Sequence, residues 1–206
     1  MTNVVLKTEA EDFCEFDGME ITLNLRCEGL SMPASMRKLQ ESADQLLSSL
    51  QNLGLDPASF SIEDLESLSL NEEQKQCARL EMKAAGDCDL EQLKLIWQCV
   101  LSMPFATEMS TSFYMKDEQS HFSALCQKAL TKAHDEAGAI GAQLGKFNPT
   151  CLSIEFVQEK REGVQSSIQT CDPIDWPEGG YPKFLDQLKR PGALLKAIAT
   201  TTWTFE

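Results

Sequence analysis

Positively charged side chains are scarce in this sequence. Its 206 residues hold 18 lysines and arginines against 32 aspartates and glutamates, which gives a formal net charge of −14 at pH 7. Surfaces that bind nucleic acid or anionic lipid need clustered cations. We therefore expect neither nucleic acid nor a membrane among the partners of this protein.

Long apolar runs are absent as well. No uninterrupted apolar run approaches the roughly 18 residues expected of a membrane-spanning helix. Residues 1–7 read MTNVVLK and contain neither the basic start nor the apolar stretch of a signal peptide. The chain as it stands therefore predicts a soluble, cytoplasmic protein.

The sequence has few of the motifs that carry common chemistry. Its two histidines, His121 and His134, lie on one predicted helix and are too far apart to share a metal ion. A nucleophilic pair of Cys126 and His134 would be separated by about 12 Å along that helix, beyond hydrogen-bond reach. The spacings C-x-x-C, G-x-S-x-G and H-E-x-x-H do not occur. We predict no metal ion and no cofactor, and we favour a role other than catalysis.

Cysteine, in contrast, is plentiful. Eight cysteines lie at positions 14, 27, 77, 88, 99, 126, 151 and 171. A chain of this length has no need of disulfides, and nothing in the sequence directs it to an oxidising compartment. Most of the eight have apolar neighbours, so we expect small buried thiols. Exposed thiols would instead favour a role in redox buffering.

Two segments contain residues that are typical of ligand sites in other contexts. Gly141–Lys146 is similar to a phosphate-binding loop but has too few residues between its glycines, so we expect a glycine cap that closes a helix. The second segment is acidic and lacks the spacing of a calcium loop, so it is more typical of a solvated strand face. Its acidic residues are Glu63, Asp64, Glu66, Glu72 and Glu73.

A third segment contains the candidate catalytic residues. Asp172 and Asp175 are two carboxylates beside Trp176, a combination that can line a sugar-like site. A turn anchored by a buried tryptophan is the simpler interpretation of the same residues.

Hydrophobic periodicity predicts an alternation of strands and helices. Full or partial alternation of apolar residues, or an enrichment in β-branched and aromatic residues, marks the segments expected to be strands, which are 4–16, 19–27, 59–70, 77–85, 107–115, 151–157 and 197–205. Apolar residues recur at every third or fourth position in the expected helices, which are 33–53, 90–101 and 120–144. Asp17-Gly18 lies between the first two strands and predicts a hairpin turn. Ser120 is expected to cap the longest helix.

This order of elements indicates an α+β protein with a single domain over residues 1–206. We expect one mainly antiparallel sheet, with two long helices and one shorter helix packed on one face. The residues expected to be buried there are Ile21, Leu23, Leu46, Leu50, Leu80, Trp97, Ala133, Ala137 and Ile140. Residues 160–195 contain many prolines and glycines. This composition predicts an irregular insertion before the terminal strand at 197–205. At that strand, Trp203 and Phe205 are expected either in a subunit contact at a sheet edge or in the core of their own subunit.

Small residues and short motifs connect residues 76–155 to a known family. Asp89 and Leu93 form an Asp-x-x-x-Leu motif in a helix, and a strand follows near Thr107–Met115. An alanine-rich helix then ends in Leu144-Gly145-Lys146, and a short strand follows at Cys151–Glu155. This pattern resembles the SIMPL-domain family, which includes bacterial oxidative-stress defence and periplasmic immunogenic proteins.

The resemblance implies an α+β fold that tends to form ring-like homo-oligomers. It also implies a location in the cell envelope, if a leader has been removed. It implies no catalytic residues, because none are established for the family. This sequence departs from the family in lacking a leader, in its eight cysteines, and in having Glu9 and Glu11 where glycines are common.

Two functions of different classes follow. The first is a non-enzymatic SIMPL-like protein with a stress-related role, which acts through self-assembly or partner binding. The second is a small-molecule enzyme with a site under the 160–192 loop that uses Asp172, Asp175 and Trp176. A deep pocket with facing titratable groups would favour the enzyme, whereas a shallow surface with a large subunit contact would favour the assembly.

Overall fold

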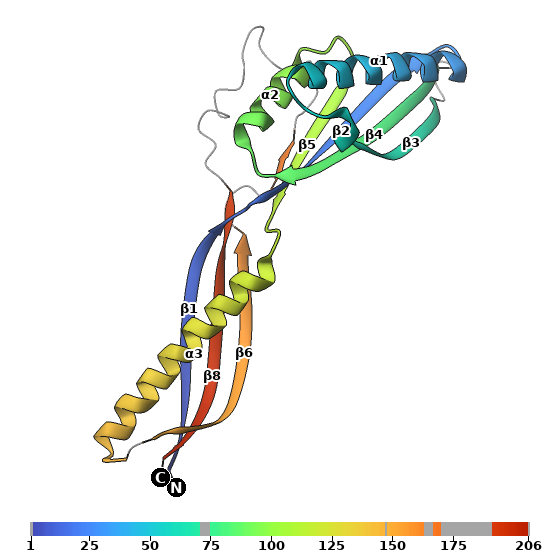
Figure 1. Cartoon of the computed structure of the whole chain (residues 1–206). Helices are drawn as coiled ribbons and strands as arrows, with labels where there is room; N and C mark the ends of the chain where they lie inside the picture. The colour runs from blue at the N-terminus through green and yellow to red at the C-terminus, as the bar shows by residue number, and fades with distance from the viewer. Residues whose placement is uncertain (1, 71–74, 147, 163–166, 170–190, 206) are drawn as a thin grey trace. The chain divides into compact units, whose positions relative to one another are not determined.

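The structure is a computed structural model that describes residues 2–70, 75–146, 148–162, 167–169 and 191–205. Its strands form two antiparallel sheets with helices packed against them, so the predicted α+β class is confirmed. The expected single sheet is wrong, because the strands divide between two sheets (Figure 1). Contacts within the chain group these sheets into two compact units, whereas the expectation of a single domain stays a prediction.

The unit that contains residues 17–114 is built on a sheet with the strand order β3-β4-β2-β5-β7. Its strands are β2 (Gly18–Gly29), β3 (Ser61–Leu70), β4 (Lys75–Asp87), β5 (Thr107–Tyr114) and β7 (Ser167–Gln169). In β2, Ile21, Leu23, Leu25 and Cys27 alternate with more exposed residues, which confirms the predicted half-buried strand. β3 pairs antiparallel with β4, the next strand along the chain.

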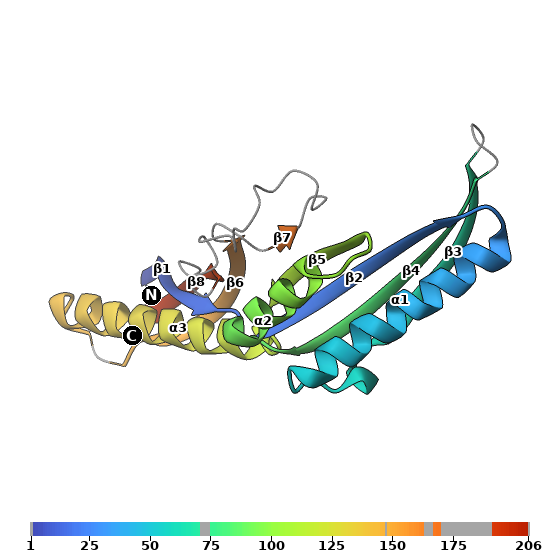
Figure 2. The same ribbon diagram turned by 90° about the horizontal axis from the view of Figure 1, so that it is seen from above.

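Two helices cover one face of this sheet, and both begin and end where the sequence predicts. α1 (Met32–Asn52) starts with a proline in its first turn and is followed by Gly54, whose φ of +85° suits glycine. α2 (Leu90–Leu101) is capped by the carboxylate of Asp89, which accepts hydrogen bonds from the N–H groups of Glu91 and Gln92. α1 lies along β2 and β4 (Figure 2), α2 contacts α1 and β5, and a short 3₁₀ turn (η1, Pro57–Ser59) follows α1. Leu46, Leu50 and Trp97 are buried in this layer, as expected.

The other unit is a three-stranded sheet with one long helix. Its strand order is β1-β8-β6, with β1 at Thr2–Glu15, β6 at Thr150–Glu162 and β8 at Gly192–Phe205. α3 (Glu118–Gln143) packs on β1 and β8. Its contact face is made of alanines, of which Ala129, Ala133 and Ala137 have no exposed surface. The short side chains allow the helix to come close to the sheet, and Thr8 donates a 2.7 Å hydrogen bond to the carbonyl oxygen of Ala129.

Several expectations about this unit are wrong. β1 and β2 do not form a hairpin, because they belong to different sheets and Asp17-Gly18 carries the chain between them. The last strand is not at an edge: β8 is the central strand, with Trp203 and Phe205 buried in the core of their own unit. Asp117, and not Ser120, caps α3, since its carboxylate accepts from the N–H of Ser120.

The structure also differs in part from the predicted core and from the predicted bounds of the insertion. Ala133 and Ala137 are buried against β1 and β8, in a core separate from the one under α1, and Ile140 is only partly buried. β6 continues to Glu162 and β8 begins at Gly192, so both strands reach into the range expected to be irregular. None of the described helices combines the length and hydropathy needed to cross a membrane.

Candidate functional site

The three residues of the enzymatic alternative are not placed by the structure. Asp172, Asp175 and Trp176 all lie outside the described residues. The enzyme with a site under the 160–192 loop therefore stays a prediction.

Cys126 and His134 both belong to α3 but have different neighbours. The ring of His134 meets the ring of Trp203 edge-on, at 5.7 Å between centroids. Cys126 Sγ lies 3.9 Å from the amide nitrogen of Gln158 on β6. The structure instead brings a different cysteine and histidine together, because Cys14 Sγ on β1 lies 3.5 Å from Nδ1 of His121 on α3.

The Cys14–His121 pair does not have the properties of an activated nucleophile. Burial raises the pKa of the Cys14 thiol, and the nearby Asp12 carboxylate raises it further, while Lys128 lowers it. An activated cysteine needs the opposite shift, toward the thiolate at neutral pH. Within the described residues, no carboxylate hydrogen-bonds to His121 to fix its orientation. The pair is a contact between β1 and α3 and not a catalytic dyad.

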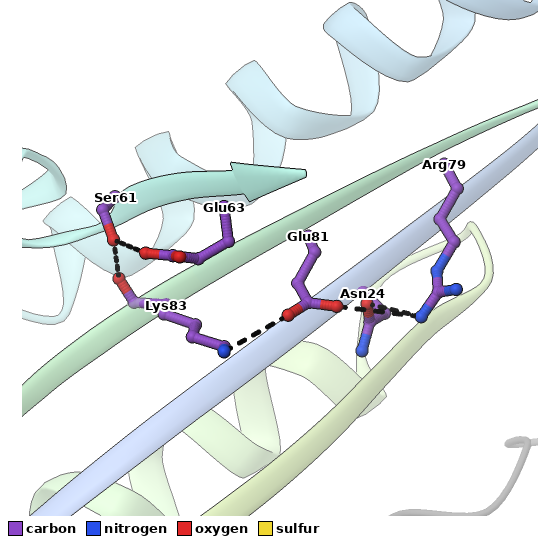
Figure 3. A network of polar contacts seen from close by, with 6 residues as sticks. All are labelled: Asn24, Ser61, Glu63, Arg79, Glu81 and Lys83. Carbon is purple, nitrogen blue, oxygen red and sulfur yellow. Dashed lines mark hydrogen bonds and ion pairs between the residues drawn. The ribbon is translucent and has the colours of Figure 1, made fainter. Parts of the chain in front are cut away.

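The acidic residues of β3 belong to a network of polar contacts on the open face of the larger sheet (Figure 3). Arg79 on β4 donates to Asn24 on β2 at 3.1 Å and lies 3.8 Å from Glu81 and 4.0 Å from Glu66. Glu81 in turn lies 3.5 Å from Lys83, and Glu63 accepts a hydrogen bond from Ser61. Residues 71–74, with Glu72 and Glu73, are outside the described residues. Each cation here lies beside a carboxylate, so the network joins neighbouring strands across a solvated face.

Gly141–Lys146 closes α3, as predicted. The helix ends at Gln143, and Gly145 has a φ of +67°, a left-handed conformation that glycine adopts easily. The N–H of Lys146 donates to the carbonyl oxygen of Gly141, and its side-chain ammonium donates to the carbonyl oxygen of Phe205. This lysine therefore ties the end of α3 to the end of β8.

The seven described cysteines are free thiols, and Cys171 lies outside the described residues. Cys27, Cys77, Cys88 and Cys99 are buried, which agrees with the expected small buried thiols. Cys14, Cys126 and Cys151 are only partly buried. Among the described residues, no group of three or more histidines, cysteines and acidic residues is arranged to hold a metal ion.

Strand β6 of the smaller unit has several exposed apolar side chains. This strand pairs with β8 on one side, and its other edge has no partner among the described strands. α3 covers β1 and β8, so β6 lies beside the covered part of the sheet. Four apolar side chains are exposed on it: Leu152 at 56%, Ile154 at 43%, Phe156 at 42% and Val157 at 54%.

These side chains lie on both faces of β6. Ile154 and Phe156 are opposite Thr201 and Ala199, which are buried under α3, so they belong to the helix side of the sheet. Val157 is opposite Ile198 and belongs to the other side. Exposed apolar side chains beside an unpaired strand edge are typical of a surface that recruits another strand.

No protein-family model matches this chain. The curated proteins contain no match either. The resemblance of residues 76–155 to the SIMPL-domain family therefore stays a prediction.

The sequence did contain a signal for this edge. The run Cys151–Val157 alternates until Phe156 and Val157, two adjacent apolar residues that must point to opposite faces. In a strand covered on one face only, this pair predicts an apolar residue on the open face. Periodicity does not show that the helix would cover the neighbouring strands and not β6.

Proposed function

We propose that this protein is a non-enzymatic, SIMPL-like protein that acts through self-assembly, and that β6 is the strand through which copies pair. The observation that carries the proposal is the unpaired edge of β6 with its four exposed apolar side chains. Pairing two such edges would satisfy the free backbone groups of both strands and cover the apolar side chains. The resemblance to the SIMPL-domain family supports the same mode of action and a stress-related role.

The two edges of this sheet differ in a way that favours β6. Charged side chains along an edge strand discourage pairing with other chains. The other edge strand, β1, has the charged residues Lys7, Glu9, Glu11 and Asp12 in its middle. The first half of β6, from Cys151 to Val157, has a single charged residue, Glu155.

Antiparallel pairing of two β6 strands is favourable in a register centred on Ile154. A two-fold axis through Ile154 places Ser153 of each copy opposite Glu155 of the other, next to the register shift that β6 has between Cys151 and Ser153. An axis through Glu155 would place that carboxylate opposite its own copy, and an axis through Val157 would place Glu155 opposite Glu159. Like charges directly opposite one another destabilise a strand pair, so these two registers are less favourable than the one centred on Ile154.

Ile154→Lys tests this proposal. The side chain is exposed, so a lysine is tolerated in the monomer, but two lysines would face each other at the two-fold axis. We expect the wild-type protein to sediment as an assembly larger than a monomer at physiological salt, and Ile154→Lys to sediment as a monomer. Leu144→Lys is the matched control, because Leu144 is also exposed, at 51%, in the same unit but away from β6.

Two results would contradict the proposal. One is a wild-type protein that stays monomeric at high concentration. The other is an assembly that Ile154→Lys leaves unchanged, which would show that copies meet at another surface.

A further inference from the structure

A second uncovered apolar surface lies in the unit that contains residues 17–114. A groove of about 610 Å³ runs between α1 and the edge strand β3. Its floor includes Ile62 and Leu65 on β3, which lie opposite Met82 and Leu80 on β4. The two β4 residues are buried, whereas Ile62 and Leu65 are 69% and 53% exposed. Among the residues that the structure describes, the apolar face of the sheet therefore continues onto β3 without cover.

None of the helices in the described part of this unit lies on β3. A helix with its side chains is about 10 Å wide and strands are about 4.8 Å apart, so one helix covers about two strands. α1 lies on β2 and β4, and α2 contacts β5 (Figure 2). On that side β3 is the one strand beyond β4, so a further helix beside α1 would cover β3 and extend past the edge of the sheet.

The rim of the groove has two charges of opposite sign without partners. Arg37 and Asp44 both line the groove from α1, seven residues apart, which is about 10.5 Å along the helix. Within the described residues, neither side chain forms an ion pair or a hydrogen bond. Lys38, which follows Arg37 in α1, differs in that its ammonium donates to the carbonyl oxygen of Glu28.

The α1 side of the groove follows the helical repeat. Its apolar wall residues are Pro33, Met36, Leu39, Ala43 and Leu47, and Gln40 lies between the two charges. A stretch from Pro33 to Leu47 is about 21 Å long, or about four helical turns. A helix packed alongside would contact this flank at i, i+3, i+4 and i+7, with residues one heptad apart next to Arg37 and Asp44.

We propose that this groove binds an amphipathic α-helix of a partner protein, which packs beside α1 over β3. Its apolar face covers Ile62, Leu65 and the flank of α1. An acidic residue of the partner faces Arg37, and a basic residue one heptad away faces Asp44. A long-chain carboxylate would satisfy Arg37 but would leave Asp44 without a cation, whereas a helix satisfies both.

The test uses three designed helical peptides with the same apolar face. They differ only at the two flanking positions one heptad apart, which hold Glu and Lys, two lysines, or two glutamates. They are titrated against the wild type, Arg37→Glu and Asp44→Lys by isothermal calorimetry at physiological salt. The two-lysine and two-glutamate combinations are unchanged by reversal of the peptide, whereas Glu/Lys is not. A fourth peptide, titrated in the same way, therefore holds the lysine and the glutamate in the reverse order, so that one of the two mixed peptides fits whether the helices run parallel or antiparallel.

We expect each protein to prefer a different peptide, by about tenfold over the mismatched ones. The wild type should prefer one of the two mixed peptides, Arg37→Glu the two-lysine peptide and Asp44→Lys the two-glutamate peptide. Ile62→Asp should abolish binding of all four, whereas Leu30→Asp, at a residue that is 88% exposed and outside the groove, should not.

Four results would overturn the inference. The first is the absence of binding at millimolar peptide. The second is a peptide affinity that is unchanged by the charge substitutions or by Ile62→Asp. The third is Arg37-dependent binding of palmitate below its micelle concentration without peptide binding, which would identify an acyl ligand. The fourth is a loss of the protein's own assembly in Ile62→Asp, which would identify a second copy as the occupant. Ile154→Lys tests the β6 edge separately, so the two proposals can fail independently.

Discussion

At the scale of single residues, the pKa of Cys14 predicts how its thiol reacts. Burial and Asp12 raise this pKa, so at neutral pH Cys14 should be alkylated more slowly than an unperturbed thiol, and its reaction midpoint should lie at a higher pH. Asp12→Asn should lower the midpoint, because it removes a negative charge that disfavours the thiolate. Lys128→Gln should raise it, because it removes a stabilising positive charge. Iodoacetamide labelling at a series of pH values, with mapping by mass spectrometry, measures both shifts.

A result in the opposite direction would change the interpretation of this residue. If Cys14 reacts faster than an unperturbed thiol at neutral pH, then His121 activates it and the pair is a candidate nucleophile after all. The sequence offered no basis for this pair. Cys14 and His121 are 107 residues apart in the chain, and only the packing of α3 on β1 brings them together.

At the scale of elements, two glycines of α3 predict opposite effects of the same substitution. A Cβ at Gly138 would meet no atom within 4 Å, so Gly138→Ala should stabilise the protein by about 0.5–1 kcal/mol through helix propensity. A Cβ at Gly141 would lie 2.9 Å from the carbonyl oxygen of Lys146 and 3.3 Å from the ring of Phe205. Gly141→Ala should therefore destabilise it by about 1–3 kcal/mol despite the same gain in propensity. Urea unfolding of the two variants measures the difference. Equal stabilisation by both would show that the end of α3 does not pack tightly on β8.

The same elements show what the sequence could predict. The sequence placed the three helices and seven of the strands, although β6 and β8 each extend five residues further than predicted, because periodicity and capping residues act locally. The pairing partner of each strand was harder to predict from the sequence. Alternation shows that one face of β1 is buried but not that its neighbour is β8, nearly the whole chain away, in place of β2. Asp17-Gly18 has the composition of a turn, yet here Asp17 accepts a hydrogen bond from the N–H of Cys88 while the chain passes to another sheet.

At the scale of the whole molecule, the position of β8 changes how self-assembly can be tested. Residues 200–206 are a terminal segment that could be deleted to test assembly. However, β8 is the central strand, and among the described strands it is the only partner of both β1 and β6. The deletion would also remove Trp203 and Phe205 from the core of that unit. A single substitution at the exposed edge of β6 avoids this problem, because it leaves the core of the unit intact.

Net charge supplies the last prediction about assembly. Chains with a formal charge of −14 repel one another, and this repulsion is screened as the Debye length falls from about 30 Å at 0.01 M salt to about 8 Å at 0.15 M. An edge that pairs through backbone hydrogen bonds and apolar side chains loses little to screening, so added salt should strengthen assembly. Sedimentation of the wild type at the two salt concentrations should show a larger average mass at the higher one. Ile154→Lys should stay monomeric at both. If the wild-type assembly instead dissociates as salt is added, its copies meet through ion pairs, and the edge of β6 is not the contact.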